Sequence, residues 1–158
     1  MRSEPADQPG VPEKVAETRR LIVGAATSCG YARLGHVAAR GQRPFTFSFG
    51  RDGDGGGDAA AAFWADQEAE GKEPLRFLVG LLDLPFAEHD GGEGAVQYVW
   101  PAAFGYDAWG EVPAADRDAL HPLYDETDFA SFEALGGYAG YRVGIDADGE
   151  WLFFVAGD

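Results

Sequence analysis

The chain has 158 residues, of which 27 are Asp or Glu and 12 are Lys or Arg, so its formal net charge is −15. Hydrophobic residues make up 46% of it, too much for a disordered acidic tail, and this predicts one folded domain with a core. The charge argues against binding to nucleic acid or to anionic membrane lipids. The single Cys excludes an internal disulfide framework and a multi-cysteine zinc site.

The first third of the chain reads as an arm followed by helices. Residues 1–12 are polar with three Pro, which predicts a mobile N-terminal arm, and residues 13–158 are expected to form a single α+β domain. Apolar residues recur at helical spacing over residues 15–29, and a second short helix follows over residues 31–41.

The end of the first predicted helix bears on the compartment. Residues 26–29 resemble a bacterial lipoprotein box, but the preceding residues are more acidic than the basic start of a signal sequence. We therefore expect a cytoplasmic protein, with a lipoprotein or a secreted form as the lesser alternative. No apolar run is long enough for a membrane-spanning helix, and Cys29 is expected to be a small buried residue.

The middle of the chain begins with a strand. Residues 44–50 alternate aromatic and hydroxyl side chains, which predicts a strand with its three Phe side chains on one side. The Gly-rich stretch 51–58 is expected to be a loop, with Asp58 as the N-cap of a helix that ends near Gly71. A further helix is expected from Pro74 to about Leu82.

The second half is expected to contain strands and one helical insertion. Residues 87–94 read as a polar turn, and Val96–Trp100 as a strand that Pro101 ends. The insertion at 102–137 is acidic and aromatic, with helices expected over residues 114–120 and 125–135.

The chain ends in a predicted hairpin. Strands are expected over residues 138–145 and 150–155, joined by a tight turn that contains Asp148-Gly149. The second strand is apolar on both faces, so it is expected to lie inside the sheet.

The segment from Glu17 to Gly50 resembles the opening of nuclear transport factor 2-like domains, and the hairpin with Trp151 is similar to their closing strands. The resemblance covers residues 13–101 and 138–158. It implies helices packed on a curved antiparallel sheet, cone-like and with a pocket, here with a helical insertion before the C-terminal hairpin. It leaves catalysis undecided, because no Asp–His pair stands at a recognisable catalytic position.

Aromatic residues are the main candidates for binding. In a cone-shaped fold they would line a concave pocket, because Tyr and Trp offer apolar area with one hydrogen-bonding group. The competing interpretation is that they only pack the core and the insertion. Arg142 is expected to form an ion pair or to hold an anionic ligand. The candidate ligand-binding residues are Trp64, Tyr98, Trp100, Tyr106, Trp109, Tyr141, Arg142 and Trp151.

Acidic residues are concentrated in the second half. Residues 83–158 contain 16 acidic and 2 basic residues, a net charge of −14, whereas residues 1–82 contain 11 and 10. This pattern fits a solvated face, or a surface for a basic protein such as a toxin that an immunity-type inhibitor neutralises.

The motifs of metal and catalytic sites are incomplete. A calcium loop that begins at Asp52 would need Glu where Phe63 stands, and the three His have no helical metal-site spacing. No metal, cofactor or catalytic residue is therefore predicted. The leading hypothesis is a non-catalytic domain that binds a small apolar molecule or a partner protein. The alternatives are an acidic inhibitor of a basic protein and a small hydrolase or isomerase, and a homodimer stays open.

Overall fold

The computed structural model describes residues 5–28, 30–49, 54–92 and 94–157. The helices are α1 (Glu13–Thr27), α2 (Tyr31–Ala38), α3 (Gly57–Ala69), α4 (Pro74–Leu82), α5 (Ala114–Ala119) and α6 (Glu126–Leu135), with short 3-10 helices η1 (Ala102–Gly105) and η2 (Trp109–Glu111). The strands are β1 (Phe45–Thr46), β2 (Asp54–Gly55), β3 (Ala87–Asp90), β4 (Val96–Trp100), β5 (Tyr141–Asp146) and β6 (Trp151–Ala156).

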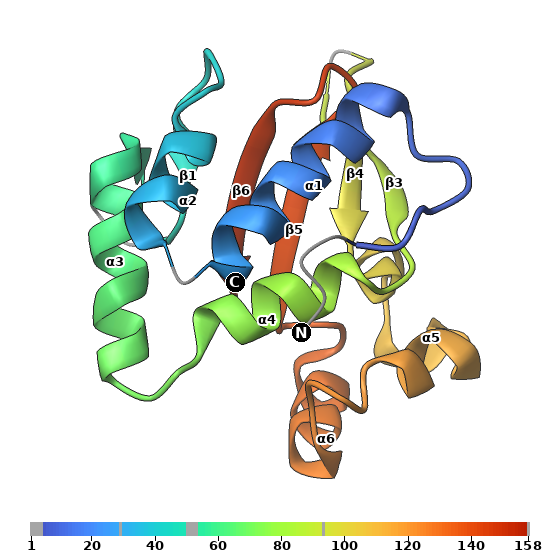
Figure 1. Ribbon diagram of the computed structural model, residues 1–158. Helices are drawn as coiled ribbons and strands as arrows, with labels where there is room; N and C mark the ends of the chain where they lie inside the picture. Colours follow the sequence, from blue (N-terminus) through green and yellow to red (C-terminus); the bar gives the residue numbers. More distant parts are fainter. Residues whose placement is uncertain (1–4, 29, 50–53, 93, 158) are drawn as a thin grey trace.

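The strands form one curved, open sheet in the order β2-β1-β6-β5-β4-β3 (Figure 1). Neighbouring strands are antiparallel except β1 and β6, which run parallel with Thr46 opposite Phe153. The predicted α+β class, with helices on a curved sheet and a helical insertion before the C-terminal hairpin, is confirmed. The apolar strand β6 lies inside the sheet, as its sequence predicts.

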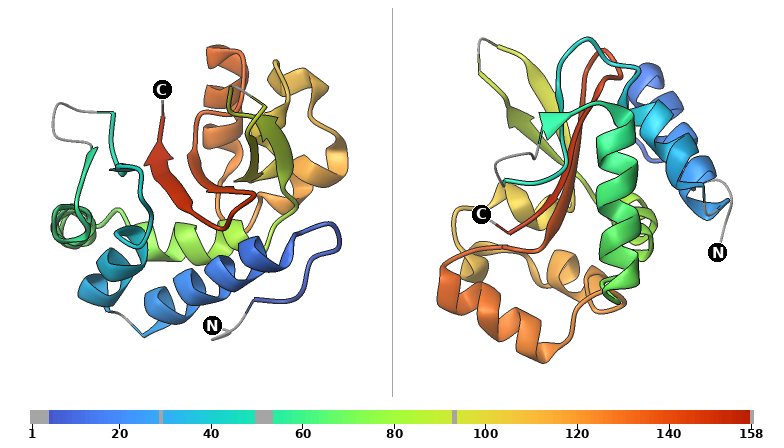
Figure 2. Two further views of the ribbon diagram at one scale, coloured as in Figure 1. Left: turned by 90° about the horizontal axis from the view of Figure 1, so that it is seen from above. Right: turned by 90° about the vertical axis from the view of Figure 1, so that its left-hand side faces the viewer.

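The helices lie mainly on one side of this sheet. Helices α1 and α4 run across one face, and α2 and α3 stand together beside β1 (Figure 2). The insertion with α5 and α6 follows β4 and lies beyond the ends of the central strands (Figure 1). Arg142 and Phe153 point to the opposite face, where they line a cleft together with residues of β1, β3, β4 and η1.

Two apolar clusters form the core. The larger lies between α1–α4 and the sheet and contains Trp64, Trp100 and Trp151, each at most 3% exposed. The smaller lies inside the insertion around Trp109 and Phe132. Burial of these large rings away from water is the main force that holds helices to sheet.

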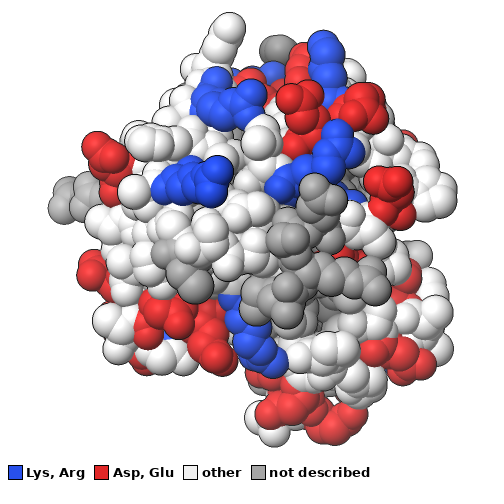
Figure 3. Space-filling model, in the orientation of Figure 1, with Lys and Arg blue, Asp and Glu red and all other residues white. Residues whose placement is uncertain are grey.

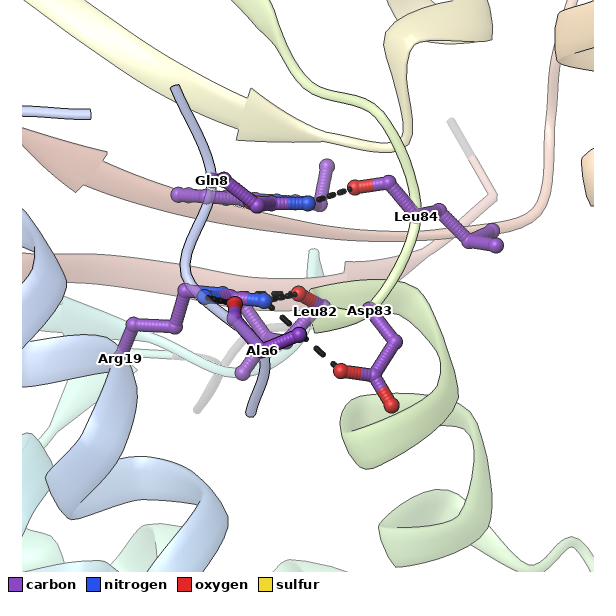
Figure 4. Close-up of polar contacts among 7 residues, drawn as sticks. Ala6, Gln8, Arg19, Leu82, Asp83 and Leu84 are labelled. Carbon is purple, nitrogen blue, oxygen red and sulfur yellow. Dashed lines mark hydrogen bonds and ion pairs between the residues drawn. The ribbon is translucent and has the colours of Figure 1, made fainter. Parts of the chain in front are cut away.

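Arg19 occupies the buried face of α1 among apolar neighbours and is only 3% exposed. Its guanidinium donates to the Leu82 carbonyl from Nε at 2.8 Å and to the Ala6 carbonyl from Nη1 at 2.7 Å (Figure 4). It also lies 3.7 Å from the Asp83 carboxylate. A buried charge is tolerated when its donors are all paired, and here the pairing joins α1 to the end of α4.

The described part of the predicted arm, residues 5–12, lies against the core. The Gln8 amide donates to the Leu84 carbonyl at 2.6 Å (Figure 4), and the Trp100 indole donates to the Gln8 Oε1 at 3.0 Å. One side chain therefore links the arm to the segment that follows α4 and to β4. That the arm is mobile stays a prediction, and residues 1–4 lie outside the described residues.

The insertion is stabilised by the capping residues of α6 and by two buried tyrosine hydroxyls. Asp125 and Asp128 form a reciprocal capping box at the start of α6, and Gly136 ends the helix with a φ of 89°. The hydroxyls of Tyr124 and Tyr138 are 3.0 Å apart. The Tyr138 hydroxyl donates to the Tyr141 carbonyl, and the Tyr141 N–H donates to the Tyr124 hydroxyl at 2.8 Å. These bonds fasten the insertion to β5.

Three local predictions need correction. The strand predicted over residues 44–50 covers only Phe45–Thr46, because the chain leaves the sheet there, and Phe49 is 53% exposed. The polar turn predicted at 87–94 is partly the edge strand β3, whose mostly exposed residues carry no apolar alternation. Asp58 lies inside α3, whose N-cap is Gly56. The predictions for Cys29 and for Asp52 fall outside the described residues.

Candidate ligand-binding cavity

A small cavity opens between α3 and the ends of β5 and β6. Its volume is about 130 Å³. Aromatic rings from the segment after β1, from α3, from β5 and from β6 form most of its wall. The lining residues are Phe47, Ser48, Phe63, Trp64, Gln67, Pro74, Tyr141, Phe154 and Ala156.

Helix α3 provides one wall through Phe63, Trp64 and Gln67, whose spacing places them on neighbouring positions of one helix face. The Trp64 indole is stacked on Trp151 with ring centroids 5.7 Å apart and an interplanar angle of 16°. It also meets the Phe45 ring edge-on at 5.8 Å. With 1% of its surface exposed, Trp64 is held firmly in the core.

The opposite wall comes from the hairpin. Tyr141 stands opposite Ala156 in the β5–β6 register, and its ring is stacked on Phe154 at 5.2 Å. The Tyr141 ring is also stacked on Phe77 of α4 at 4.8 Å. Burial raises the pKa of the Tyr141 hydroxyl, against the opposing effect of Lys72, so the phenol is neutral near pH 7.

The Trp64 indole N–H has no hydrogen-bond partner among the described residues, although it is buried. The neighbouring Trp151 indole, by contrast, donates to the Phe153 carbonyl at 3.1 Å. A buried donor without an acceptor costs about 1 to 3 kcal/mol. This nitrogen has almost no accessible surface, so the N–H lies within the packed core and does not open on the cavity.

Ring faces make up most of this lining, and few of its groups are titratable. Of the nine lining residues, Tyr141 is the only one with a titratable side chain. A hydrolase or isomerase of the predicted kind would need a carboxylate or His with a shifted pKa at the cavity, and neither residue type lines it. The walls are suited to a flat apolar group, and Ser48, Gln67 and Tyr141 are the lining residues with polar side chains.

The eight predicted ligand-binding residues do not lie together. Trp64 and Tyr141 line the cavity. Three others, Tyr98, Trp100 and Trp151, are buried in the same core without lining it. Trp109 belongs to the core of the insertion, and Tyr106 is 37% exposed.

Arg142, the eighth, points to the face of the sheet away from α1 and α4. It lines a separate cleft of about 230 Å³, with its guanidinium carbon 4.9 Å from the centre of the Phe104 ring and 5.2 Å from that of Phe49. Its Nη1 donates to the Gly157 carbonyl at 3.0 Å. These contacts hold Arg142 by ring stacking and a backbone bond.

Three lining rings were missing from the sequence-based candidates, namely Phe47, Phe63 and Phe154. Phe63 lies in a predicted helix, and Phe47 and Phe154 lie in predicted strands. Because all three are apolar, their aromatic character was the only sequence signal that could have marked them as lining a cavity. Which of these rings faces a hollow depends on how α3 lies against the hairpin, a long-range relationship that local patterns do not encode.

Comparisons with protein-family models, with curated proteins and with solved structures gave no match for this chain. Among the described residues, no helix combines the length and the apolar character needed to cross a bilayer.

Proposed function

We propose that this protein is a non-catalytic domain that binds a small apolar molecule in the cavity beside Trp64. The observation that carries the proposal is a hollow of about 130 Å³ with a largely aromatic wall, bordered by two residues that the sequence singles out, Trp64 and Tyr141. An engineered apolar cavity of about 150 Å³ in another protein binds benzene. A ligand, or the part of a ligand that enters here, is therefore about the size of one six-membered ring.

The proposal includes a relation to nuclear transport factor 2-like domains. The order α1, α2, β1 and the closing hairpin of β5 and β6 supports it. Many members of that superfamily bind small apolar molecules or partner proteins without catalysis. The proposed compartment is the cytoplasm, which fits a chain whose single Cys can form no internal disulfide.

The test is benzene binding followed by the indole N–H signals in NMR spectra. We expect benzene to shift the Trp64 signal through its ring current, and Ala156→Leu, which places a larger side chain at the cavity, to abolish that shift. Ala115→Leu on the exposed side of α5 is the matched control and should bind benzene like the unmodified protein. Equal binding by both variants, or no binding by the unmodified protein, would refute the proposed function.

A second candidate function is binding of a basic protein by the insertion. Residues 102–137 contain eight acidic residues and one basic residue, Arg117, and Figure 3 shows carboxylates over the lower region where Figure 1 places α5 and α6. Over α1 and α2 Lys and Arg side chains are mixed with Asp and Glu (Figure 3). The acidic excess thus belongs to one region of the molecule, which favours oriented association with a basic partner.

A groove of about 360 Å³ between α5 and α6 is the observation that favours this candidate. Its floor holds the Trp109 and Phe129 rings, 5.2 Å apart, and Asp118, Glu126 and Glu133 stand around it. Asp118 and Glu126 lie 3.8 and 3.9 Å from His121 nitrogens and are 75% and 85% exposed. A Lys or Arg side chain would meet aromatic faces and carboxylates here together.

A peptide of alternating Gly and Arg tests this second candidate by calorimetry. We expect Glu126→Gln with Glu133→Gln to weaken its binding severalfold, and Glu68→Gln with Glu88→Gln, which removes two exposed charges elsewhere, to change it much less. Equal weakening by the two pairs would show that net charge alone attracts the peptide, and would remove the groove from consideration.

A further inference from the structure

A groove of about 620 Å³ lies between α1, the C-terminal end of α2 and the turn that joins β5 to β6. Its lining comes from three segments, within residues 14–18, 37–43 and 148–151. It shares no lining residue with the cavity beside Trp64. Its volume lies within the usual range of small-molecule sites, so it is a second candidate site.

The walls of this groove are held in place by polar contacts. The Arg43 N–H donates to the Glu150 carboxylate at 2.6 Å, and the Arg43 guanidinium lies 3.4 Å from the buried Asp146 carboxylate. Asp146 in turn accepts from two backbone N–H groups of the turn, at 3.0 and 2.9 Å. The Thr18 hydroxyl donates to the Gly149 carbonyl at 2.5 Å and so ties α1 to the same turn.

Charges of both signs line the groove without pairing with one another. Lys14 and Arg40 are exposed bases of the lining, and Glu17 and Asp148 are exposed acids. Among the described residues, none of these four side chains has a hydrogen bond or an ion pair. Two further charged residues of the lining lie 3.9 Å apart and pair with each other. The lining thus holds three bases and three acids, whose formal charges cancel.

This balance limits the class of ligand, because the chain as a whole carries a charge of −15. A simple anion is repelled by that net charge and finds no excess of bases here, and a simple cation is attracted equally to the acidic insertion. A molecule with one carboxylate and one ammonium group has no net charge and pairs with both sets of side chains. Val37 and Trp151 add apolar surface to the lining.

We propose that the groove binds a short peptide with both termini free. The carboxylate of the peptide pairs with Lys14 and Arg40. Its ammonium group pairs with Glu17 and Asp148. Because these side chains come from three separate segments, a peptide with its charges several bonds apart reaches more of them than a free amino acid does. This binding activity is independent of the apolar ligand proposed for the other cavity.

Calorimetry with trialanine and its blocked forms tests this proposal. Trialanine amide lacks the carboxylate, N-acetyl-trialanine lacks the ammonium group, and the doubly blocked peptide lacks both. At neutral pH and low salt, we expect trialanine to bind about threefold to fivefold more tightly than either singly blocked form. Equal affinities for the four peptides, or no binding of trialanine, would overturn the proposal and leave the cavity beside Trp64 unaffected.

A pair of substitutions assigns the carboxylate to its side chains. Lys14→Gln with Arg40→Gln should weaken the binding of trialanine and not that of trialanine amide, which has no carboxylate to pair. Arg33→Gln with Lys72→Gln is the matched control, because it removes two exposed bases outside the groove. With this control the difference between the two peptides should persist.

A second pair assigns the ammonium group. Glu17→Gln with Asp148→Asn should weaken the binding of trialanine and not that of N-acetyl-trialanine. Asp66→Asn with Glu68→Gln, two exposed acids of α3 outside the groove, is the control and should leave both affinities in their original ratio. A groove variant that weakens all four peptides by the same factor would show that no terminus is recognised, and this too would overturn the proposal.

Discussion

The guanidinium of Arg19 on α1 closes the C-terminal end of α4 by donating two hydrogen bonds to the carbonyl of Leu82, from Nε at 2.8 Å and from Nη2 at 2.5 Å. The last carbonyls of a helix have no partners within it, and when buried they need donors from elsewhere. Arg19 supplies them and reaches Ala6 of the arm with its remaining amino group. Burial lowers the pKa of Arg19, and the Asp83 carboxylate opposes that effect.

Arg19→Met tests this connection. The Met side chain keeps the apolar stem but leaves the Leu82 and Ala6 carbonyls without their donors, so we expect the free energy of unfolding to fall by about 2 to 4 kcal/mol. Arg20→Met is the matched control, because Arg20 is exposed on the same helix and pairs with Glu13, and it should change stability little. Urea denaturation measures the free energy of unfolding of both variants. Equal losses would show that the buried hydrogen bonds of Arg19 stabilise the fold no more than the ion pair of Arg20 does.

Helices α2 and α3 touch through two glycines. A Cβ on Gly35 would lie 2.3 Å from the Gly57 carbonyl oxygen, which belongs to the backbone and cannot swing aside. Gly35→Ala should therefore cost about 2 kcal/mol or more despite the better helix propensity of Ala. Gly24→Ala in α1 has nothing within 4 Å and should gain about 0.5 to 1 kcal/mol.

The same substitution reports on the cavity. Because α3 carries Trp64, separating α2 from α3 at Gly35 should also displace one wall and weaken benzene binding. Thermal unfolding and benzene titration of Gly35→Ala and Gly24→Ala together check this. A Gly35→Ala protein as stable as Gly24→Ala would contradict the close packing of the two helices.

Because Tyr124 and Tyr138 are buried, we expect the free energy of unfolding to decrease at high pH. Burial raises the pKa of Tyr124 from 10.0 to about 12, and it raises that of Tyr138 as well. A tyrosine that is harder to ionise in the folded state stabilises the fold fully below pH 10 and loses this effect as the pH rises towards 12. We expect the Tyr124 contribution to fall by up to about 3 kcal/mol over that interval.

Tyr124→Phe should flatten this decline in part, since Tyr138 remains, and should lower stability at neutral pH because the Tyr141 N–H loses its acceptor. Tyr106→Phe, at an exposed phenol, is the control and should follow the unmodified protein. The measurement is urea denaturation at several pH values between 9 and about 12. Parallel curves for the two variants would show that Tyr124 ionises as easily folded as unfolded.

The sequence predicts the helices and the hairpin well because their signals are local. The helical spacing of α1 and the turn at Asp148-Gly149 each lie within a few residues. The edge strand β3 escapes detection because Glu88, His89 and Asp90 are all exposed and show no alternation. Its pairing partner β4 creates it, and that pairing is not visible in the segment itself.

The cavity was predictable only in kind. An aromatic-lined pocket was expected, and Trp64 and Tyr141 were among its candidates. Trp100, also a candidate, only packs in the core, and Trp151 borders a different hollow beside α1 and the β5–β6 turn. Side-chain chemistry does not tell a ring that borders a hollow from one that fills the interior. What separates Trp64 from Trp151 is a hydrogen bond to the Phe153 carbonyl, which depends on the backbone of β6.

That difference yields a final prediction about two stacked tryptophans. Trp64 and Trp151 are 1% and 3% exposed and lie face to face, so replacing either by Phe removes a similar apolar area. Trp151→Phe also removes a donor and leaves the Phe153 carbonyl without it, whereas Trp64→Phe removes an N–H that has no partner. We therefore expect Trp151→Phe to destabilise the fold by about 1 to 3 kcal/mol more than Trp64→Phe. Chemical denaturation of the two variants measures the difference directly, without any ligand. A Trp64→Phe loss as large as that of Trp151→Phe would mean that the Trp64 N–H is satisfied in solution.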